Sequence, residues 1–457
     1  MAKQENLKGN GITEGVIWKQ LLLYFFPILL GTFFQQMYNT VDAVVVGQFV
    51  GTEALAAVGG ATGTLVNLIV GFFVGLSSGA TVIISQYFGA REENGVSRTV
   101  HTAIAMGLGG GLILSIAGII VSPAILRLMD TPEEVMTYAT TYIRIYFAGM
   151  IPSLIYNIGS GILRAVGDSK RPLYFLICAC LVNIVLDIVL VIVFHMGVAG
   201  VSIATIFSQG VSAVLITRAL MHSDDLYQLE FRKIRFHKAA LISLIWVGCP
   251  TGIQSVLYSV TNMLIQTFLN NLGTDTVAAW SAFGKIDSLY WMVNNAFGIA
   301  VTTFVGQNFG AGKYDRMKKS VRIGLCMGLC TALTLTLIFY NFGTPLFRLF
   351  TSDENVVSIG MQMLYHVAPA YCLFVFIELL SGALRGTGDV VIPMLITCFG
   401  VCLLRIAWLF FIVPLAPGLN TIVLSYPVTW AITAVMFIVY YCYQAKKWPK
   451  SSAKKTA

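Results

Sequence analysis

The chain has 457 residues, of which 57% are hydrophobic and only 11% are charged, with a formal net charge of +8. A soluble globular protein is typically about 25% charged, so this composition excludes an ordinary soluble enzyme or binding domain. Apolar runs of roughly 20 residues recur along the whole length, which predicts an all-α polytopic membrane protein.

Twelve apolar segments long enough to cross a bilayer follow one another along the chain. Prolines inside several of them are tolerated because neighbouring helices satisfy the freed backbone groups. The first segment contains Pro27 and, further on, the carboxylate of Asp42. The predicted transmembrane helices are 17–48, 54–88, 97–126, 134–164, 170–194, 197–221, 239–270, 275–307, 316–349, 355–386, 390–414 and 419–445.

Most Lys and Arg residues lie at the span ends that share one side of the membrane. By the positive-inside rule that side is the cytoplasm, and both termini are expected there. The net charge of +8 follows from this asymmetry, so we do not read it as a sign of nucleic-acid binding. Residues 446–457 are predicted to form a basic cytoplasmic tail.

Four short motifs occur twice, each time 221 residues apart. Such self-similarity indicates a tandem repeat of two six-span halves, which are parallel because each has an even number of spans. We predict an N-lobe of residues 1–222, a cytoplasmic linker of 223–238 and a C-lobe of 239–445, with the substrate site between the lobes. The motifs are 85–90 with 306–311, 126–128 with 347–349, 161–168 with 382–389, and Pro172 with Pro393.

The first half has two intramembrane acids that the second half lacks. Asp42 and Asp187 map to apolar positions of the other half, near Leu264 and Trp408. An acid in the bilayer core costs at least about 2.5–3.5 kcal/mol, so such residues usually face a bundle interior or a wet cavity. A functional reason for both acids is therefore expected.

Depth counting brings these acids together with two further polar side chains. At about 1.5 Å per residue, Asp42, Asp187 and Thr205 each lie about 12–13 Å below the outer end of their spans. Asn183 is one turn deeper than Asp187 on the same helix face. Two carboxylates in a low dielectric cannot both stay ionised cheaply, which predicts a shared proton or a bound Na⁺. The alternative is a purely structural hydrogen-bond network.

In the second half, Glu378 and Arg405 are the notable ionisable residues. Two interpretations remain open: a structural ion pair between them, or a Glu378 that faces substrate. Lys285 and Asp287 are two residues apart and do not face each other on a helix, so helix packing or lateral pairing is expected for them. All nine Cys lie in apolar segments with no His or acid to complete a ligand set, so no metal site other than a possible Na⁺ at Asp42 and Asp187 is predicted.

A cavity lined by aromatic residues and Met suits flat, greasy cations, through cation–π contacts and adaptable packing. Any one such residue more often belongs to the core. The candidates for the substrate cavity are Gln35, Gln36, Met37, Tyr38, Asn157, Phe283, Tyr290, Trp291, Glu378 and Arg405.

The whole pattern resembles the multidrug and toxic compound extrusion (MATE) family. The resemblance is carried by the segment from Pro27 through Asp42 to Gln48, by 51–57, by the repeated 86–90 and 307–313 motifs, and by the paired turns 163–164 and 384–385. It implies a V-shaped pair of six-helix lobes. In the DinF-like prokaryotic branch it also implies an N-lobe cation site at positions filled here by Asp42, Asn183, Asp187 and Thr205. The NorM-like branch uses an acid in the seventh span, and this chain has none there.

We therefore expect a secondary active antiporter that exports amphipathic or cationic compounds, driven by inward flow of H⁺ or Na⁺, with no cofactor. The first span would bend near Pro27 when the ion binds. We expect a monomer in the prokaryotic inner membrane. The alternative is a lipid-linked sugar flippase of the same superfamily, and an enzyme is disfavoured because no nucleophile with a nearby base is evident.

Overall fold

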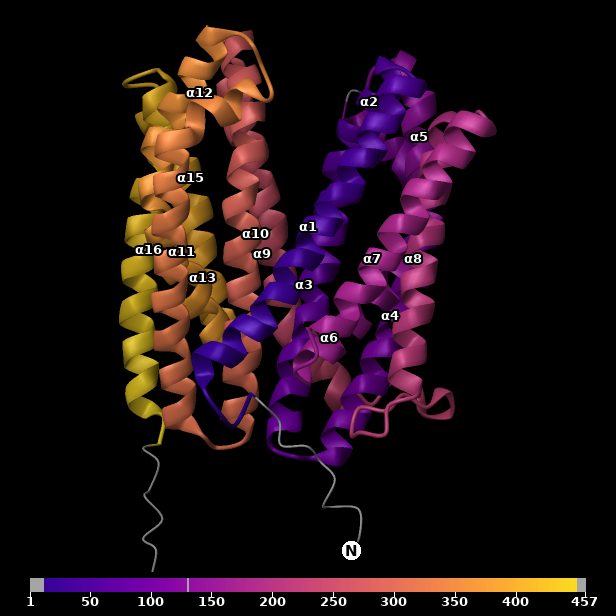
Figure 1. Cartoon of the computed structure of the whole chain (residues 1–457), viewed down its shortest axis with the longest axis vertical. Helices are drawn as coiled ribbons and strands as arrows, with labels where there is room; N and C mark the ends of the chain where they lie inside the picture. Colours follow the sequence, from indigo (N-terminus) through magenta and orange to yellow (C-terminus); the bar gives the residue numbers. More distant parts are fainter. Residues whose placement is uncertain (1–11, 130, 450–457) are drawn as a thin grey trace, which may run out of the picture. The chain divides into compact units, whose positions relative to one another are not determined.

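The computed structural model describes residues 12–129 and 131–449. The first eleven residues of the predicted N-lobe and residues 450–457 of the predicted tail lie outside this part. Within it the chain forms helices and connecting turns, with no strand, which confirms the all-α prediction (Figure 1).

Each predicted span corresponds to a helix or to a short series of helices. The first half comprises α1 (Ile17–Phe49), α2 (Thr52–Gly59), α3 (Ala61–Gly89), α4 (Glu93–Leu128), α5 (Glu133–Ala148), α6 (Met150–Ala165), α7 (Lys170–Asp187), η1 (Ile188–Val193) and α8 (Gly197–Met221). The second half comprises η2 (Phe231–Lys233), α9 (Lys238–Asn270), α10 (Thr274–Gly310), α11 (Tyr314–Arg348), α12 (Glu354–Val367), η3 (Ala368–Ala370), α13 (Tyr371–Gly386), α14 (Val391–Thr397), η4 (Cys398–Leu403), α15 (Leu404–Ala407), η5 (Trp408–Ile412) and α16 (Leu419–Lys447).

Ten helices of the described chain are long and apolar enough to cross a membrane, or eleven if the pair α5–α6 counts as one span. This pair is bent by 52°, and the break falls at Gly149, where a Cβ would lie 2.4 Å from Ile206 Cγ1. The one predicted span outside this count, 275–307, corresponds to α10, which carries Lys285 and Asp287. The chain is a multi-pass membrane protein.

The helices form two compact units. The N-terminal unit is Phe26–Ser255, and the C-terminal unit consists of the residues up to Phe25 and those from Val256 onward. Helix α1 therefore passes from one unit to the other just before Pro27, and α9 does so after Pro250. The predicted lobes, 1–222 and 239–445, were defined from the sequence repeat, and their boundaries stay a prediction.

In the N-terminal unit, α3 packs closely against the first half of α9. A Cβ on Gly75 would lie 2.5 Å from Gly252 N, and one on Gly79 would lie 2.8 Å from Gly248 N. Two pairs of glycines spaced four apart thus face each other. Small residues at this spacing let helix backbones approach directly, which is the usual way to gain packing energy in a bilayer.

One close contact occurs in both units at repeat-related positions. A Cβ on Gly161 of α6 would lie 2.8 Å from Thr81 Oγ1 of α3. In the C-terminal unit, a Cβ on Gly382 of α13 would lie 2.9 Å from Thr302 Oγ1 of α10. Both residues of the second pair are 221 positions after those of the first, so the same helix packing is built twice.

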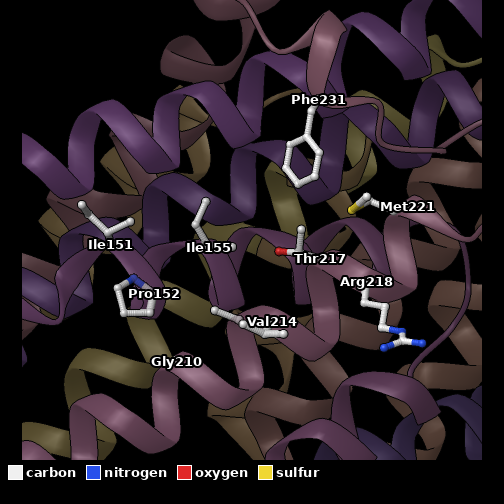
Figure 2. A pocket seen from close by; sticks show the side chains of 10 residues that line it. Ile151, Pro152, Ile155, Gly210, Val214, Thr217, Arg218, Met221 and Phe231 are labelled. Carbon is white, nitrogen blue, oxygen red and sulfur yellow. The ribbon is translucent and has the colours of Figure 1, made fainter.

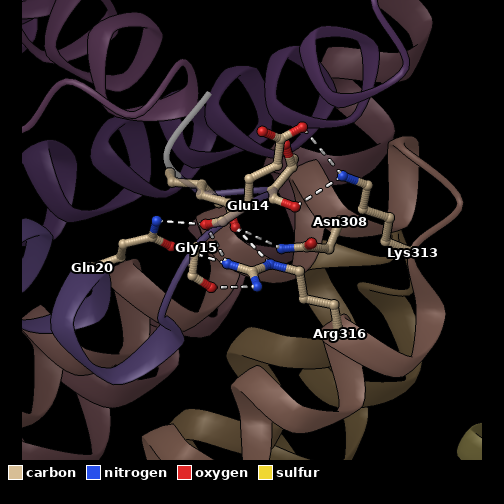
Figure 3. Close-up of polar contacts among 8 residues, drawn as sticks. Glu14, Gly15, Gln20, Asn308, Lys313 and Arg316 are labelled. Carbon is tan, nitrogen blue, oxygen red and sulfur yellow. Dashed lines mark hydrogen bonds and ion pairs between the residues drawn. The ribbon is translucent and has the colours of Figure 1, made fainter. Parts of the chain in front are cut away.

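The segment before α1 is held by α11 in the C-terminal unit (Figure 3). The Arg316 guanidinium donates from Nε to Ile12 O (3.1 Å), from Nη1 to Gly15 O (2.8 Å) and from Nη2 to Glu14 O (2.7 Å). Lys313 Nζ donates to Thr13 O at 2.9 Å. The start of α1 is therefore fixed to one unit while the rest of the helix belongs to the other.

Candidate functional site

The four residues of the predicted cation cluster lie on three helices of the N-terminal unit. Asp42 is on α1, Asn183 and Asp187 are one turn apart at the end of α7, and Thr205 is on α8. Thr205 Oγ1 lies 3.3 Å from Asp42 Oδ2 and 3.0 Å from Val201 O. The hydroxyl has one proton, so it donates to one of these acceptors at a time.

Asn183 and Asp187 also lie within interaction range of the Asp42 carboxylate. Asp187 is fully buried, and Asp42 is 6% exposed. Asp42 Oδ1, both carboxylate oxygens of Asp187 and both amide atoms of Asn183 make no hydrogen bond within the described part of the chain. Buried polar atoms without partners are costly, so these oxygens are suited to a proton shared between the acids or to a hard monovalent cation.

The helix changes its winding directly after the second acid. Asp187 ends α7, and Ile188–Val193 continue it as a π-helical segment, η1. Such π-turns are rare and are found frequently at functional sites. The local unwinding leaves Asp187 at a place where the regular backbone ladder is interrupted.

Three further polar side chains surround the cluster and were not predicted. Tyr142 and Tyr146 of α5 stack with ring centroids 6.1 Å apart and interact electrostatically with Asp42. Gln209 Nε2 lies 3.5 Å from the hydroxyl of the predicted residue Tyr38. Gln209 is one turn after Thr205, and the two tyrosines are one turn apart. This helical spacing is the sequence signal that could have pointed to the three residues.

The other predicted cavity residues of the first half are dispersed. Gln35 and Gln36 are exposed on α1, and Met37 is half-buried. Asn157 of α6 donates to Ser153 O in its own helix at 2.9 Å. Pro27 is buried in α1 at the boundary between the units. Their roles stay predictions.

A mainly apolar pocket of about 480 Å³ lies between α6 and α8 of the N-terminal unit (Figure 2), and none of the four residues of the acid cluster lines it. Its walls include Pro152, Thr217 and Met221, with Phe231 of η2 beside them. Arg218 is the one charged residue that lines it. Nothing in this lining suits cation coupling, so we assign it no part in that chemistry.

The C-terminal unit contains a different pocket, of about 360 Å³. Among the predicted cavity residues, Trp291, Glu378 and Arg405 line it, whereas Phe283 and Tyr290 are core residues that stack on Trp280 and Tyr371. The complete lining is Tyr258, Asn262, Trp291, Phe374, Glu378, Val401, Arg405, Tyr426 and Trp430.

The ion pair of Glu378 is with Arg385, at 3.2 Å, and not with Arg405. The two residues are seven positions apart on α13, two turns along one face. Asp287 accepts hydrogen bonds from Trp291 Nε1 (2.6 Å) and Tyr371 Oη (2.5 Å). The Asp287 carboxylate therefore takes part in packing between helices, as expected.

Comparison with known proteins decides the family. The MatE family model matches residues 27–189 and, a second time, residues 250–411. This chain belongs to the MatE family. Both matches begin at a proline, Pro27 and Pro250, and the double match agrees with the tandem repeat.

Relatives of this MATE protein cover nearly the whole chain. A probable multidrug resistance protein of Bacillus subtilis, YoeA, is 28% identical over 97% of both chains. A second, YpnP, is 30% identical over 87% of this chain and 89% of its own. The probable multidrug resistance protein NorM of Thermotoga maritima is 25% identical over 85% of this chain and 84% of its own. Assignment to the DinF-like branch stays a prediction.

Solved structures share the fold. A MOP superfamily transporter from Pyrococcus furiosus superposes with a TM-score of 0.90 at 21% identity, covering 97% of this chain and 99% of that one. An outward-facing multidrug resistance MATE family transporter has the same TM-score and identity, covering 96% and 98%. At this identity the likeness shows the fold alone.

Proposed function

We propose that this MATE protein exports small amphipathic or cationic drugs by antiport, driven by inward flow of H⁺ or Na⁺. The names of its relatives as multidrug resistance proteins support drug efflux. The observation that carries the coupling mechanism is the buried Asp42 and Asp187 pair, whose oxygens lack sufficient partners in the protein.

The two acids would work as a switch of charge. With both ionised, the cluster attracts a cation strongly but is costly in a low dielectric. A proton or Na⁺ entering from outside neutralises it, with Asn183 and Thr205 supplying further oxygen ligands for Na⁺. Neutralisation removes the attraction for a cationic drug and permits α1 to rearrange about Pro27, so drug and ion occupy the unit in turn.

The proposed transporter is a monomer in the inner membrane, with both termini in the cytoplasm. The proposal assigns it no catalytic residues and no cofactor. A lipid-linked sugar flippase is the weaker alternative, because the described pocket of the C-terminal unit carries a single unpaired cation, Arg405, where a pyrophosphate would call for several.

The test is efflux of a cationic dye from proteoliposomes under a pH gradient and, separately, a Na⁺ gradient. We expect one of the gradients to drive efflux, and Asp42→Asn and Asp187→Asn to reduce it to the level of empty liposomes. Asp224→Asn, an exposed acid in the linker, is the matched control and should behave as the unmodified chain. Full efflux by both cluster variants would overturn the mechanism, and movement of lipid-linked sugar without dye efflux would favour the flippase.

A further inference from the structure

The guanidinium of Arg405 is buried in the pocket of the C-terminal unit. The residue is 3% exposed. Arg405 Nη2 donates to Thr429 Oγ1 at 3.1 Å, and the guanidinium lies 3.9 Å above the Tyr426 ring centroid and 5.8 Å from that of Trp430. Stacking on aromatic faces stabilises a buried cation, but it does not supply an opposite charge.

No carboxylate of the described chain neutralises Arg405. Glu378, in the same pocket, is paired with Arg385. Asp287 is engaged by Trp291 and Tyr371. The titratable groups that interact with Arg405 are Tyr426, Tyr258 and Cys402, all of which are neutral at physiological pH. Arg405 Nε, moreover, has no hydrogen-bond partner among the described residues.

A buried, unpaired guanidinium strongly favours an anion. Its planar donors match a carboxylate, and a charge-assisted hydrogen bond in a dry site is among the strongest available. Besides Arg405, Glu378, Asn262 and Val401, the lining consists of aromatic side chains: Tyr258, Trp291, Phe374, Tyr426 and Trp430. At about 360 Å³ the pocket is at the small end of ligand sites, which suits a compact bicyclic ring system.

We propose that this pocket binds a small aromatic carboxylate, with the carboxylate on Arg405 and the rings against Trp291, Phe374 and Trp430. The Asn262 amide also lines the pocket and is available to the ligand. This inference goes beyond the proposed function, which concerns cations and the N-terminal unit, and it does not depend on the coupling ion. It gives the protein a second binding site of opposite charge preference.

The experiment measures equilibrium binding of radiolabelled 2-naphthoate to the purified full chain in phosphatidylcholine nanodiscs. The neutral isostere 2-naphthamide is the competitor. We expect 2-naphthoate to bind at least about tenfold more tightly than 2-naphthamide, the effect of one charge-assisted hydrogen bond. Arg405→Gln should abolish this preference, while Arg322→Gln, an exposed arginine on α11 of the same unit, should keep it.

A second variant guards against a folding defect in Arg405→Gln. Glu378→Gln removes the one negative charge of the pocket lining and should strengthen 2-naphthoate binding by about two- to fivefold. A purely structural role for Arg405 does not predict this gain. Equal affinity for naphthoate and naphthamide, undiminished binding by Arg405→Gln or weaker binding by Glu378→Gln would each overturn the proposal. Asp42→Asn should leave binding unchanged, which separates this site from the proposed coupling mechanism.

Discussion

The fifth spans of the two halves carry buried charges of opposite sign, and each sixth span contributes a threonine. In the N-terminal unit, α7 and α8 contribute Asp187 and Thr205. In the C-terminal unit, the corresponding helices contribute Arg405 on α15 and Thr429 on α16. Both charged groups are almost fully inaccessible to solvent, at 0% and 3% exposed. The duplication kept the helix scaffold and inverted the chemistry placed on it.

Irregular winding accompanies the charge in both units. The π-helical η1 begins directly after Asp187, and η4 and η5 flank the short α15 that carries Arg405. A π-turn shifts the facing of the side chains that follow it and is common at functional sites. The comparison therefore indicates that the fifth span of each half, α7–η1 and α14–η5, carries the chemistry that differs between the halves. Helices α3–α6 and α10–α13 form the shared scaffold.

The largest expected effect is a difference in dye efflux between a variant of the N-terminal unit and a variant of the C-terminal unit. Asp187→Asn should abolish ion-driven efflux of a cationic dye, because it removes half of the charge that attracts the ion. Arg405→Gln should keep most of the efflux, because removing an unpaired buried cation leaves the acid cluster intact. Efflux in proteoliposomes measures both. Loss of efflux in a folded Arg405→Gln protein would show that the units do not divide the chemistry in this way.

A close helix contact provides the next prediction. Gly75→Ala in α3 should lower the free energy of unfolding by about 2–3 kcal/mol, since the new Cβ meets the backbone of Gly252 at 2.5 Å. The repeat places Ala296 at the equivalent position of the C-terminal unit, so only the N-terminal unit needs glycine here.

Unfolding by denaturing detergent checks the Gly75 prediction. The matched control is Gly210→Ala in α8, where a Cβ meets no atom within 4 Å. That change should be neutral or stabilise the protein by up to about 1 kcal/mol through helix propensity. Equal stability of the Gly75 and Gly210 variants would contradict the packing of α3 on α9.

A smaller effect on stability, expected equally in both units, tests the helix contact that the repeat builds twice. Gly161→Ala and Gly382→Ala should each destabilise the protein by about 1–2 kcal/mol, because each new methyl group meets a threonine hydroxyl closer than van der Waals contact, at 2.8 and 2.9 Å. The same detergent titration measures both. If the losses in free energy of unfolding of the two variants differ by more than about 2 kcal/mol, the two halves do not share this contact.

The smallest expected effect concerns the hydroxyl of the acid cluster. Thr205→Val should raise the ion concentration for half-maximal efflux by about three- to tenfold, since one hydrogen bond or ligand oxygen is lost. Thr205→Ser keeps the hydroxyl and is the control. An unchanged ion dependence in Thr205→Val would remove Thr205 from the proposed site without affecting the two acids.

Much of the fold was accessible from the sequence because hydropathy and the 221-residue repeat are local or periodic signals. The contact of Asp42 with Thr205 followed from depth counting, since both helices begin at a predictable interface. The Glu378–Arg385 pair was also accessible through its two-turn spacing, but the two interpretations of Glu378, an ion pair with Arg405 or a substrate-facing carboxylate, did not include it.

Other features required tertiary structure. The aromatic surroundings of Arg405 come from four separate helices, and no periodicity reports which rings converge. The same holds for Tyr142 and Tyr146 of α5, because no spacing within their own helix reports their interaction with Asp42. The exchange of the first turns of α1 and α9 between the units has no sequence signal, because it depends on packing against residues far along the chain.

The most direct measurement of the central claim is ion movement coupled to dye. Proteoliposomes loaded with dye would be monitored for uptake of H⁺, with a trapped pH indicator, and of labelled Na⁺, as dye leaves. The account predicts dye-dependent uptake of one ion by the unmodified chain, and neither such uptake nor dye efflux above that of empty liposomes by Asp187→Asn. Undiminished dye-coupled ion uptake by Asp187→Asn would contradict the account.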